Sequence, residues 1–513
     1  MTPTRRKKAR STSEIRFYPN DPDAPVGLQP ATPVSPSASE PSFTIDGRRY
    51  APAPYAPGTL AFQYWQGEVA LARTIRVWED LFDRDFTQWH DGRPLRVRLR
   101  AGKDLNAFYD RKSLQFFYDI DQKTGRTVYA AESLDIVAHE AGHAVLDVYQ
   151  PGFWSTADLE TASFHEAFAD CSALLVTLTD PAVRRALLEE AAGAWDRSNQ
   201  VSRLAEALGR AIYDNFGPGA VSDPTRLRDA RNGFRYALPD TLPPGAGDTE
   251  LAAEPHSFSR VFTGAFYDAL VWVLASALKK MEGDEAVEHA RRLLGRLLAR
   301  AIEKLPPGSA RYGDIGALMR GTDQIEEGGL ATAGIEAGFA RHGIELPALA
   351  GEKAGRKRGR KQGAGRLSPL RALDPERPGG LAAIRAALHL PASAKLARHS
   401  TPLRSREGSR EQLLHVHEFP IRHRSLGAFS GIIIRVPCGC TLTRAGSGEV
   451  LDLTLAPHPH PGPAELLRSI RPWIRMGAIH PVRGVRAPSR ELFRERKPFR
   501  LTAEGLLERV YFD

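Results

Sequence analysis

The stretch that most constrains this chain is His139-Glu140-Ala141-Gly142-His143, which lies in a run with the apolar spacing of a helix. Two histidines four positions apart on a helix project from the same face, so both imidazole rings can reach one metal ion. Zinc binds neutral imidazole nitrogen atoms and, in enzymes, keeps one coordination position open for water. Glu140 follows the first histidine directly and could take a proton from that water. The pattern predicts a zinc site that activates water.

A pair of acidic residues strengthens the prediction of a metal site. Glu166 and Asp170 lie four residues apart in a second run with helical spacing, so their carboxylates share one face. Glu166 could provide a third ligand to the zinc ion. Asp170 could accept a hydrogen bond from the other ring nitrogen of a ligand histidine and so fix its tautomer. The alternative is a surface helix whose two histidines bind no metal, and it leaves this acidic pair unexplained.

Together these residues resemble the thermolysin-like zinc metallopeptidases, which belong to the gluzincins. The resemblance extends from about residue 60 to residue 346 and also rests on Asn106-Ala107-Phe108-Tyr109, Phe234-Arg235 and His256-Ser257-Phe258-Ser259. It implies an α+β fold with two lobes: a β-containing N-terminal lobe, the active-site helix, and a mainly helical C-terminal lobe. Zinc would lie in the cleft between them. The activity that the resemblance implies is hydrolysis of peptide bonds, as an endopeptidase.

The resemblance also implies roles for residues that do not bind the metal. Asn106 and Ala107 would belong to an edge strand that pairs with the bound peptide. His256 would join Glu140 as a catalytic residue by donating to the oxyanion of the transition state, which needs donors besides the metal. Arg235 would hold the carbonyl oxygen of the substrate. Three nearby carboxylates could orient the catalytic histidine: Asp248, Glu250 and Glu254.

The calcium site of the resembled family is incomplete in this sequence. Asp135 matches a calcium ligand of the family, but residues 177–180 offer one carboxylate where the family has an acidic cluster. Because calcium needs six to eight oxygen ligands, a structural calcium ion is not expected.

Apolar spacing predicts the main elements around these motifs. A helix is expected at residues 60–82, and strands at residues 95–99, 107–109 and 114–120. Six further helical runs follow the acidic pair, at residues 171–178, 181–195, 201–213, 260–279, 284–304 and 312–319. The metallopeptidase domain is predicted to span residues 59–349.

The N-terminal segment carries no secretory signal. Residues 1–58 are rich in proline, serine and charge, which is typical of a disordered arm, and no apolar run follows the basic cluster at residues 5–10. No run is expected to be long enough to cross a membrane, and three cysteines cannot form a disulfide framework. These features predict a cytoplasmic protein without membrane contact. Export without a leader is the alternative.

The composition changes abruptly near residue 350. Residues 350–367 are predicted to form a basic, glycine-rich linker, and residues 368–513 a basic domain of unknown function with mixed α and β structure. The formal net charge of residues 352–513 is +16, whereas the other 351 residues carry −7. This asymmetry favours an anionic partner, either nucleic acid or an acidic protein, in addition to the peptide or protein substrate.

Two other functions stay open from the sequence. One is a scaffold with a catalytically idle zinc site, although the intact Glu140 argues against it. The other is a nucleic-acid-associated protein that works through its basic C-terminal region. Four residues of that region could hold a second metal ion, but their spacing matches no familiar zinc finger: His415, His417, Cys438 and Cys440.

Overall fold

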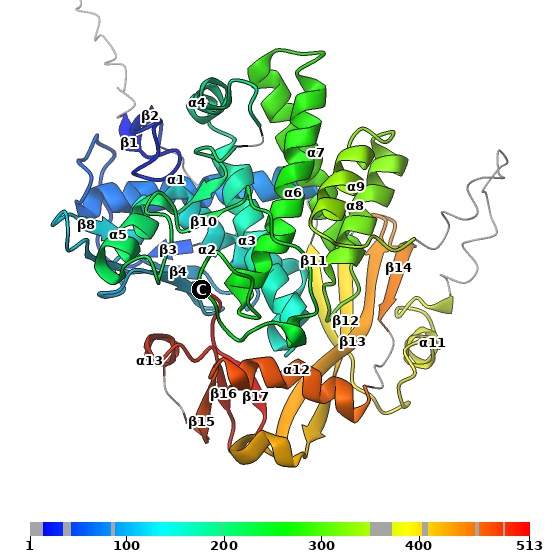
Figure 1. Cartoon of the computed structure of the whole chain (residues 1–513). Helices are drawn as coiled ribbons and strands as arrows, with labels where there is room; N and C mark the ends of the chain where they lie inside the picture. Colours follow the sequence, from blue (N-terminus) through cyan, green and yellow to red (C-terminus); the bar gives the residue numbers. More distant parts are fainter. Residues whose placement is uncertain are drawn as a thin grey trace, which may run out of the picture.

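The computed structural model of this chain describes residues 14–33, 43–83, 88–195, 197–348, 372–402, 409–456, 461–485 and 488–513. Helices and strands are mixed throughout the described residues, which confirms the predicted α+β class (Figure 1). The predicted linker at residues 350–367 lies outside the described residues.

A short hairpin opens the described part of the chain. Its strands are β1 (Ile15–Phe17) and β2 (Gln29–Ala31), and β1 packs against the helix α1 (Leu60–Phe82). Ile15 and Phe17 are 0% and 1% exposed. The prediction of a disordered arm is therefore wrong for this hairpin, because two apolar residues on one face of a strand are enough to anchor it. Residues 1–13 and 34–42 of the predicted arm lie outside the described residues.

A four-stranded sheet follows, with the order β3-β4-β6-β5. Its strands are β3 (Phe43–Ile45), β4 (Leu95–Arg98), β6 (Ser113–Phe116) and β5 (Ala107–Tyr109). β3, β4 and β6 run parallel, and β5 runs antiparallel to β6. Because β5 is the edge strand of this sheet, β6 pairs with only one side of its backbone. A separate hairpin joins β7 (Tyr118–Ile120) to β8 (Thr127–Tyr129).

Helices make up most of residues 134–341. The pair α2 (Leu134–Tyr149) and α3 (Leu159–Thr177) lies in the centre, and α1 packs against both helices. The helices that follow are α4 (Pro181–Ala191), α5 (Glu206–Phe216), α6 (Pro255–Ala277), α7 (Gly283–Lys304), α8 (Tyr312–Glu326) and α9 (Thr332–Arg341). Two short strands, β9 (Arg203–Leu204) and β10 (Arg228–Asp229), pair antiparallel beside them.

One of these helices is long and apolar enough to cross a membrane. This is α6, with a mean hydropathy of 1.2 over an 18-residue window, so the prediction that no run reaches this length is wrong. Within that window 78% of the residues are buried inside the protein, where α6 packs against α3, α7 and α9. Its apolar surface is thus covered by other helices, which accounts for its composition.

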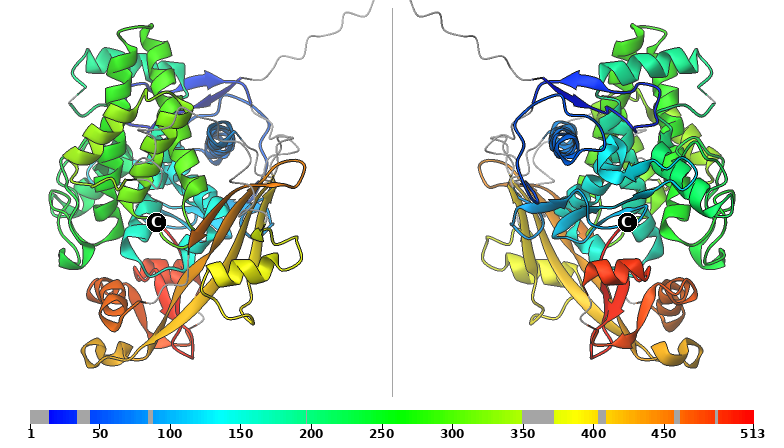
Figure 2. Two further views of the ribbon diagram at one scale, coloured as in Figure 1. Left: turned by 90° about the vertical axis from the view of Figure 1, so that its right-hand side faces the viewer. Right: turned by 90° about the vertical axis from the view of Figure 1, so that its left-hand side faces the viewer.

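The C-terminal region has two small sheets. The first is antiparallel and contains β11 (Ala397–Pro402), β12 (Ser409–Ile421), β13 (Ile432–Arg444) and β14 (Val450–Ala456). The second contains β15 (Ile479–Arg483), β16 (Phe499–Leu501) and β17 (Leu507–Arg509). The helices of this region are α11 (Gly380–Ala387), α12 (Pro463–Arg475) and α13 (Ser489–Arg494). β12 and β13 form a long ribbon that reaches from the helical part to the second of these sheets (Figure 2).

The C-terminal region packs directly on the rest of the chain. Arg410 of β12 donates to the carbonyl oxygen of Tyr149 at 2.7 Å, and the indole nitrogen of Trp473 donates to the carbonyl oxygen of Ala157 at 2.8 Å. Residues of α12, β16 and β17 belong to the same hydrophobic core as α1, α2 and α3. Cys438 and Cys440 are buried in a smaller apolar cluster beside α11.

Candidate metal centre

The candidate centre lies between two helices that are buried along nearly their whole length. α2 begins after Ser133, with Asp135 in its first turn, and α3 begins after Asp158, whose carboxylate accepts a hydrogen bond from the backbone of Thr161. Acidic residues at these positions satisfy backbone donors and suit the helix dipole. The facing sides of the two helices carry the polar residues of the centre, which the surrounding core shields from water.

Three potential metal ligands converge across this helix pair. Suitable ligand atoms of His139, His143 and Glu166 all lie within 4.8 Å of one another. The Nε2 atom of each histidine is 3.4 Å from Oε2 of Glu166. Nε2 of His143 and Oε2 of Glu166 are buried and have no hydrogen-bond partner. Because buried polar atoms without partners cost free energy, these atoms fit a zinc ion held by two imidazoles and a carboxylate.

Hydrogen bonds on the far side of the rings orient both histidines. Nδ1 of His139 lies 3.1 Å from Oδ1 of Asp170, which also accepts from Arg228 at 3.0 Å. Nδ1 of His143 lies 2.8 Å from Nδ1 of His165. If each Nδ1 carries the proton, both Nε2 atoms present a lone pair to the common point. The predicted contact between Asp170 and a ligand histidine is present in the structure.

Glu140 faces the same space from α2. Its side chain is buried, lines the cavity beside His139, and keeps Oε2 without a hydrogen-bond partner. Burial raises the pKa of the Glu140 carboxyl to about 8, and His139 partly opposes this increase. A carboxylate in this position can exchange a proton with a group bound at the centre.

The comparison with protein families falls on this same part of the chain. Residues 66–147 match the catalytic domain of thermolysin metallopeptidases. This thermolysin-like segment runs from α1 into α2, contains both histidines and Glu140, and ends before Glu166. It confirms the resemblance to the thermolysin-like family and supports a zinc metallopeptidase. No curated protein matches the chain.

The thermolysin-like segment also contains the edge strand of the sheet. Asn106 and Ala107, at the start of β5, line the cavity together with Glu140. The amide of Ala107 is held by the side chain of Asn106 at 2.9 Å. The structure therefore brings two of the three predicted substrate-binding residues, Asn106 and Ala107, to the candidate centre.

His256 reaches the centre from the first turn of α6. Its Nε2 lies 3.4 Å from Oε2 of Glu166, and its Nδ1 lies 2.7 Å from Oε1 of Glu254. Glu254 is thus the orienting partner among the three carboxylates that the sequence left open. Burial lowers the pKa of His256, but the Glu254 and Glu166 carboxylates outweigh burial and hold this pKa well above its ordinary value.

Arg235 does not line the cavity of the candidate centre, so the structure does not bring this predicted substrate-binding residue together with Asn106 and Ala107. Its guanidinium donates to the carbonyl oxygen of Arg341, and the backbone beside it pairs with His342 through the amide of Tyr236 at 2.7 Å. The end of α9 therefore holds this segment away from the cavity. Arg228 of β10 lines the cavity instead. No local motif marks Arg228, because its place depends on the pairing of two short strands.

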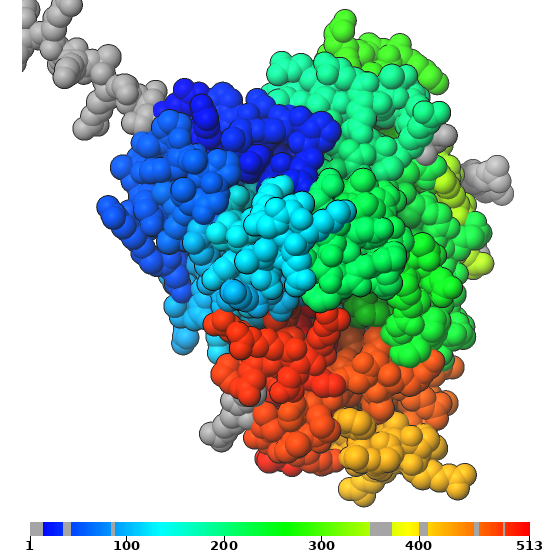
Figure 3. All heavy atoms as spheres, turned by 60° about the vertical axis from the view of Figure 1, so that its left-hand side comes forward, coloured from blue at the N-terminus to red at the C-terminus, as the bar shows by residue number. Residues whose placement is uncertain are grey.

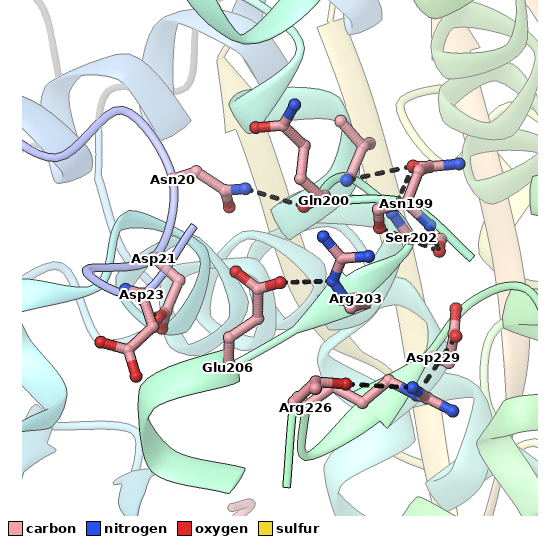
Figure 4. Close-up of polar contacts among 12 residues, drawn as sticks. Asn20, Asp21, Asp23, Asn199, Gln200, Ser202, Arg203, Glu206, Arg226 and Asp229 are labelled. Atoms are coloured by element: carbon pink, nitrogen blue, oxygen red, sulfur yellow. Dashed lines mark hydrogen bonds and ion pairs between the residues drawn. The ribbon is translucent and has the colours of Figure 1, made fainter. Parts of the chain in front are cut away.

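The residue that matches a calcium ligand of the family is engaged by the protein itself. Asp135 accepts hydrogen bonds from the backbone of Ala205 and of Ile136, both at 2.7 Å, and from Ser133. The neighbouring contacts join the N-terminal segment to the loop before α5, where the side chain of Asn20 donates to the carbonyl oxygen of Gln200 (Figure 4). Protein donors thus satisfy both carboxylate oxygens of Asp135. Among the described residues, His139, His143 and Glu166 are the cluster that could hold a metal ion.

Proposed function

We propose that the protein is a zinc-dependent endopeptidase. The observation that carries the proposal is the convergence of His139, His143 and Glu166 beside a cavity. His139 and Glu140 line this cavity, and one carboxylate oxygen of Glu140 has no hydrogen-bond partner. The thermolysin-like segment supports the same class of reaction. The cavity would form part of a cleft between a β-containing N-terminal lobe and a mainly helical C-terminal lobe.

The two histidines and Glu166 would hold zinc, which when bound supplies Lewis acidity and lowers the pKa of a water molecule to about 7. Glu140 would accept a proton from this water molecule while the oxygen of the water attacks the carbonyl carbon of the substrate. It would then pass the proton to the nitrogen of the leaving amine. Burial raises the pKa of Glu140 and so makes its ionised form a stronger proton acceptor.

Other residues would bind and orient the substrate. Asn106 and Ala107 would align an extended peptide along the edge of β5. His256, oriented by Glu254, would donate to the developing oxyanion. Arg228, rather than Arg235, would hold the carbonyl oxygen of the substrate, because Arg228 lines the cavity and contacts Asp170. A cytoplasmic location and an anionic partner for the C-terminal region stay predictions from the sequence.

The test compares the purified full chain with Glu140→Gln. We expect one bound zinc per chain in both proteins, and hydrolysis of internal peptide bonds that falls by at least about a hundredfold in Glu140→Gln. Zinc is measured by elemental analysis, and cleavage of a peptide library by mass spectrometry. Glu285→Gln, at an exposed position of α7, is the matched control and should behave as the parent. Absence of zinc, or equal cleavage by Glu140→Gln, would contradict the proposal.

A further inference from the structure

The last residues of the chain lie on the free edge of β5. Residues 510–513, which we call the terminal segment, follow β17 and run antiparallel to β5. The amide of Tyr109 donates to the carbonyl oxygen of Phe512 at 2.8 Å, and the amide of Phe512 donates to the carbonyl oxygen of Tyr109 at 2.9 Å. This is the hydrogen-bond pattern by which an extended peptide adds to the edge of a sheet.

The side chain of Phe512 fills the space beside the candidate metal ligands. Its ring lies 3.9 Å from that of His165, nearly parallel at 14°, and 5.4 Å from that of His143. The guanidinium of Arg509 covers the ring at 4.1 Å. Phe512 is 2% exposed, so water reaches little of this position. An aromatic side chain of a bound peptide would need the same space.

Asp513 reaches into the cavity of the candidate centre itself. Its backbone oxygen contacts Nε2 of His256, the atom proposed to donate to the oxyanion. It lines the cavity together with Ala107 and Glu140, and the volume that remains is about 40 Å³. That volume holds water molecules but no peptide, because ligand pockets in proteins measure roughly 300 Å³ or more.

We propose that the terminal segment is an internal competitor of the substrate, and that the position of Phe512 marks a subsite for an aromatic residue. This inference rests on the proposed function of the same site. A peptide can pair with β5 and reach Glu140 only after Phe512 and Asp513 have left. The competing segment lies in the basic C-terminal region, so this region restrains the centre.

The C-terminal region holds the terminal segment in place from the other side. The amide of Val510 donates to the carbonyl oxygen of Pro498 at 2.8 Å, and the ring of Tyr511 packs 5.2 Å from that of Phe493. Just before the terminal segment, the carbonyl oxygen of Arg509 in β17 also accepts a hydrogen bond from the indole nitrogen of Trp154, between α2 and α3, at 3.3 Å. In the space-filling view the C-terminal residues, in red, lie directly against the cyan and green parts of the chain (Figure 3). Removal of the last two residues leaves these anchoring contacts intact.

The experiment compares the full chain with a variant that ends at Tyr511. The first readout uses the zinc-loaded Glu140→Gln forms of both, and a fluorescent peptide with the sequence of residues 508–513 (Glu-Arg-Val-Tyr-Phe-Asp). We expect the shortened variant to bind this peptide about tenfold more tightly or better, because the internal competitor is gone. The same peptide with glycine in place of phenylalanine should bind more weakly. Fluorescence anisotropy measures both affinities.

The second readout is peptide hydrolysis by the forms that retain Glu140. We expect kcat/KM of the shortened variant to rise by about tenfold or more over that of the full chain. Phe512→Ser is a second variant that keeps the chain length and should act in the same direction. Val482→Ser changes an exposed residue of β15 and should leave both readouts unchanged. Circular dichroism and zinc content check that each variant folds.

The two readouts separate failure of this inference from failure of the proposed function. Equal peptide affinity in the full chain and both variants would overturn the inference, even if all of them cleave peptides. If the shortened variant binds the peptide more tightly but no form cleaves peptides, the terminal segment is an internal competitor and the proposed peptidase function is wrong. Tighter binding together with faster cleavage would uphold both.

Discussion

Asp170 illustrates how one residue can govern a site without binding the metal. Its Oδ1 lies 3.1 Å from Nδ1 of His139 and 3.0 Å from Arg228, and its Oδ2 accepts from Thr263 at 3.2 Å. Burial alone would raise the pKa of this carboxyl, but Arg228 and His139 hold the pKa below its ordinary value. Asp170 is thus a fixed anion that keeps the His139 ring in one tautomer and one orientation.

The substitution Asp170→Asn is expected to weaken zinc binding by about 10- to 100-fold, because partners of this kind hold the ligand ring in place. The zinc affinity is measured by competition with a chromophoric chelator. Asp452→Asn, at an exposed position of β14, is the control. An unchanged affinity in Asp170→Asn would show that packing alone orients His139.

At the level of elements, the site depends on how closely α2 and α3 approach each other. A Cβ atom at Gly142 would lie 2.9 Å from the Cβ atom of Ser172 and 3.0 Å from the Cα atom of Ala169. Ser172 also links three helices, since its hydroxyl donates to the carbonyl oxygen of Ala138 and accepts from the indole of Trp78. Gly142, between His139 and His143, therefore sets the helix separation that lets Glu166 approach both histidines.

We expect Gly142→Ala to lower the free energy of unfolding by about 1–3 kcal/mol through overpacking, although alanine favours a helix by about 1 kcal/mol over glycine. Urea unfolding followed by circular dichroism measures this change. Gly219→Ala is the control, because a Cβ atom at Gly219 would meet no heavy atom within 4 Å. Equal or higher stability of Gly142→Ala would mean that α2 and α3 can separate without cost.

At the level of the whole molecule, the C-terminal region shares a core with the catalytic part. Trp473 is 1% exposed, stacks edge-to-face on Phe499 at 4.7 Å, and donates to the carbonyl oxygen of Ala157 just before α3. Domains with a common core are expected to unfold together rather than one after the other. The boundary predicted near residue 350 marks a change in composition but not a break in packing.

Trp473→Ala should cost about 3–5 kcal/mol, as removal of a large buried side chain does. We expect the urea midpoint for loss of circular dichroism and the midpoint for zinc release to fall together. Trp272→Ala, at a position that is 38% exposed, should cost less. If zinc release keeps its midpoint while part of the circular dichroism signal is lost earlier, the two regions unfold independently.

The spacing of residues along the sequence predicted those parts of the fold and site that lie on a single helix. The helix expected at residues 60–82 is observed as α1 with the same bounds, and the spacing of His139, His143, Glu166 and Asp170 placed them on facing helix sides. β13 extends to Arg444, past the point at which its run of apolar residues ends. Its Pro-Cys-Gly-Cys stretch breaks the apolar alternation, yet Gly439 lets the backbone of β12 approach closely there.

The spacing of residues along the sequence could not predict contacts between distant segments. Arg228 contacts Asp170 because β10 pairs with β9, and nothing in its neighbours reveals this. Phe512 meets Tyr109 across some 400 residues of sequence, with a single bridge that leaves no periodic signal. Spacing alone predicted the residues that one helix turn relates. The family resemblance added His256, Asn106 and Ala107, which also line the cavity, but neither signal indicated Arg228 or Phe512.

The order in which a ribosome makes this chain gives the pairing of Phe512 with β5 a further consequence. All of His139, His143 and Glu166 emerge roughly 340 residues before Phe512, which at about 5–20 residues per second is some tens of seconds earlier. During that interval the edge of β5 has no partner. If the ligand residues fold in that interval, a metal ion could reach them from this side before residues 510–513 are made and pair with β5.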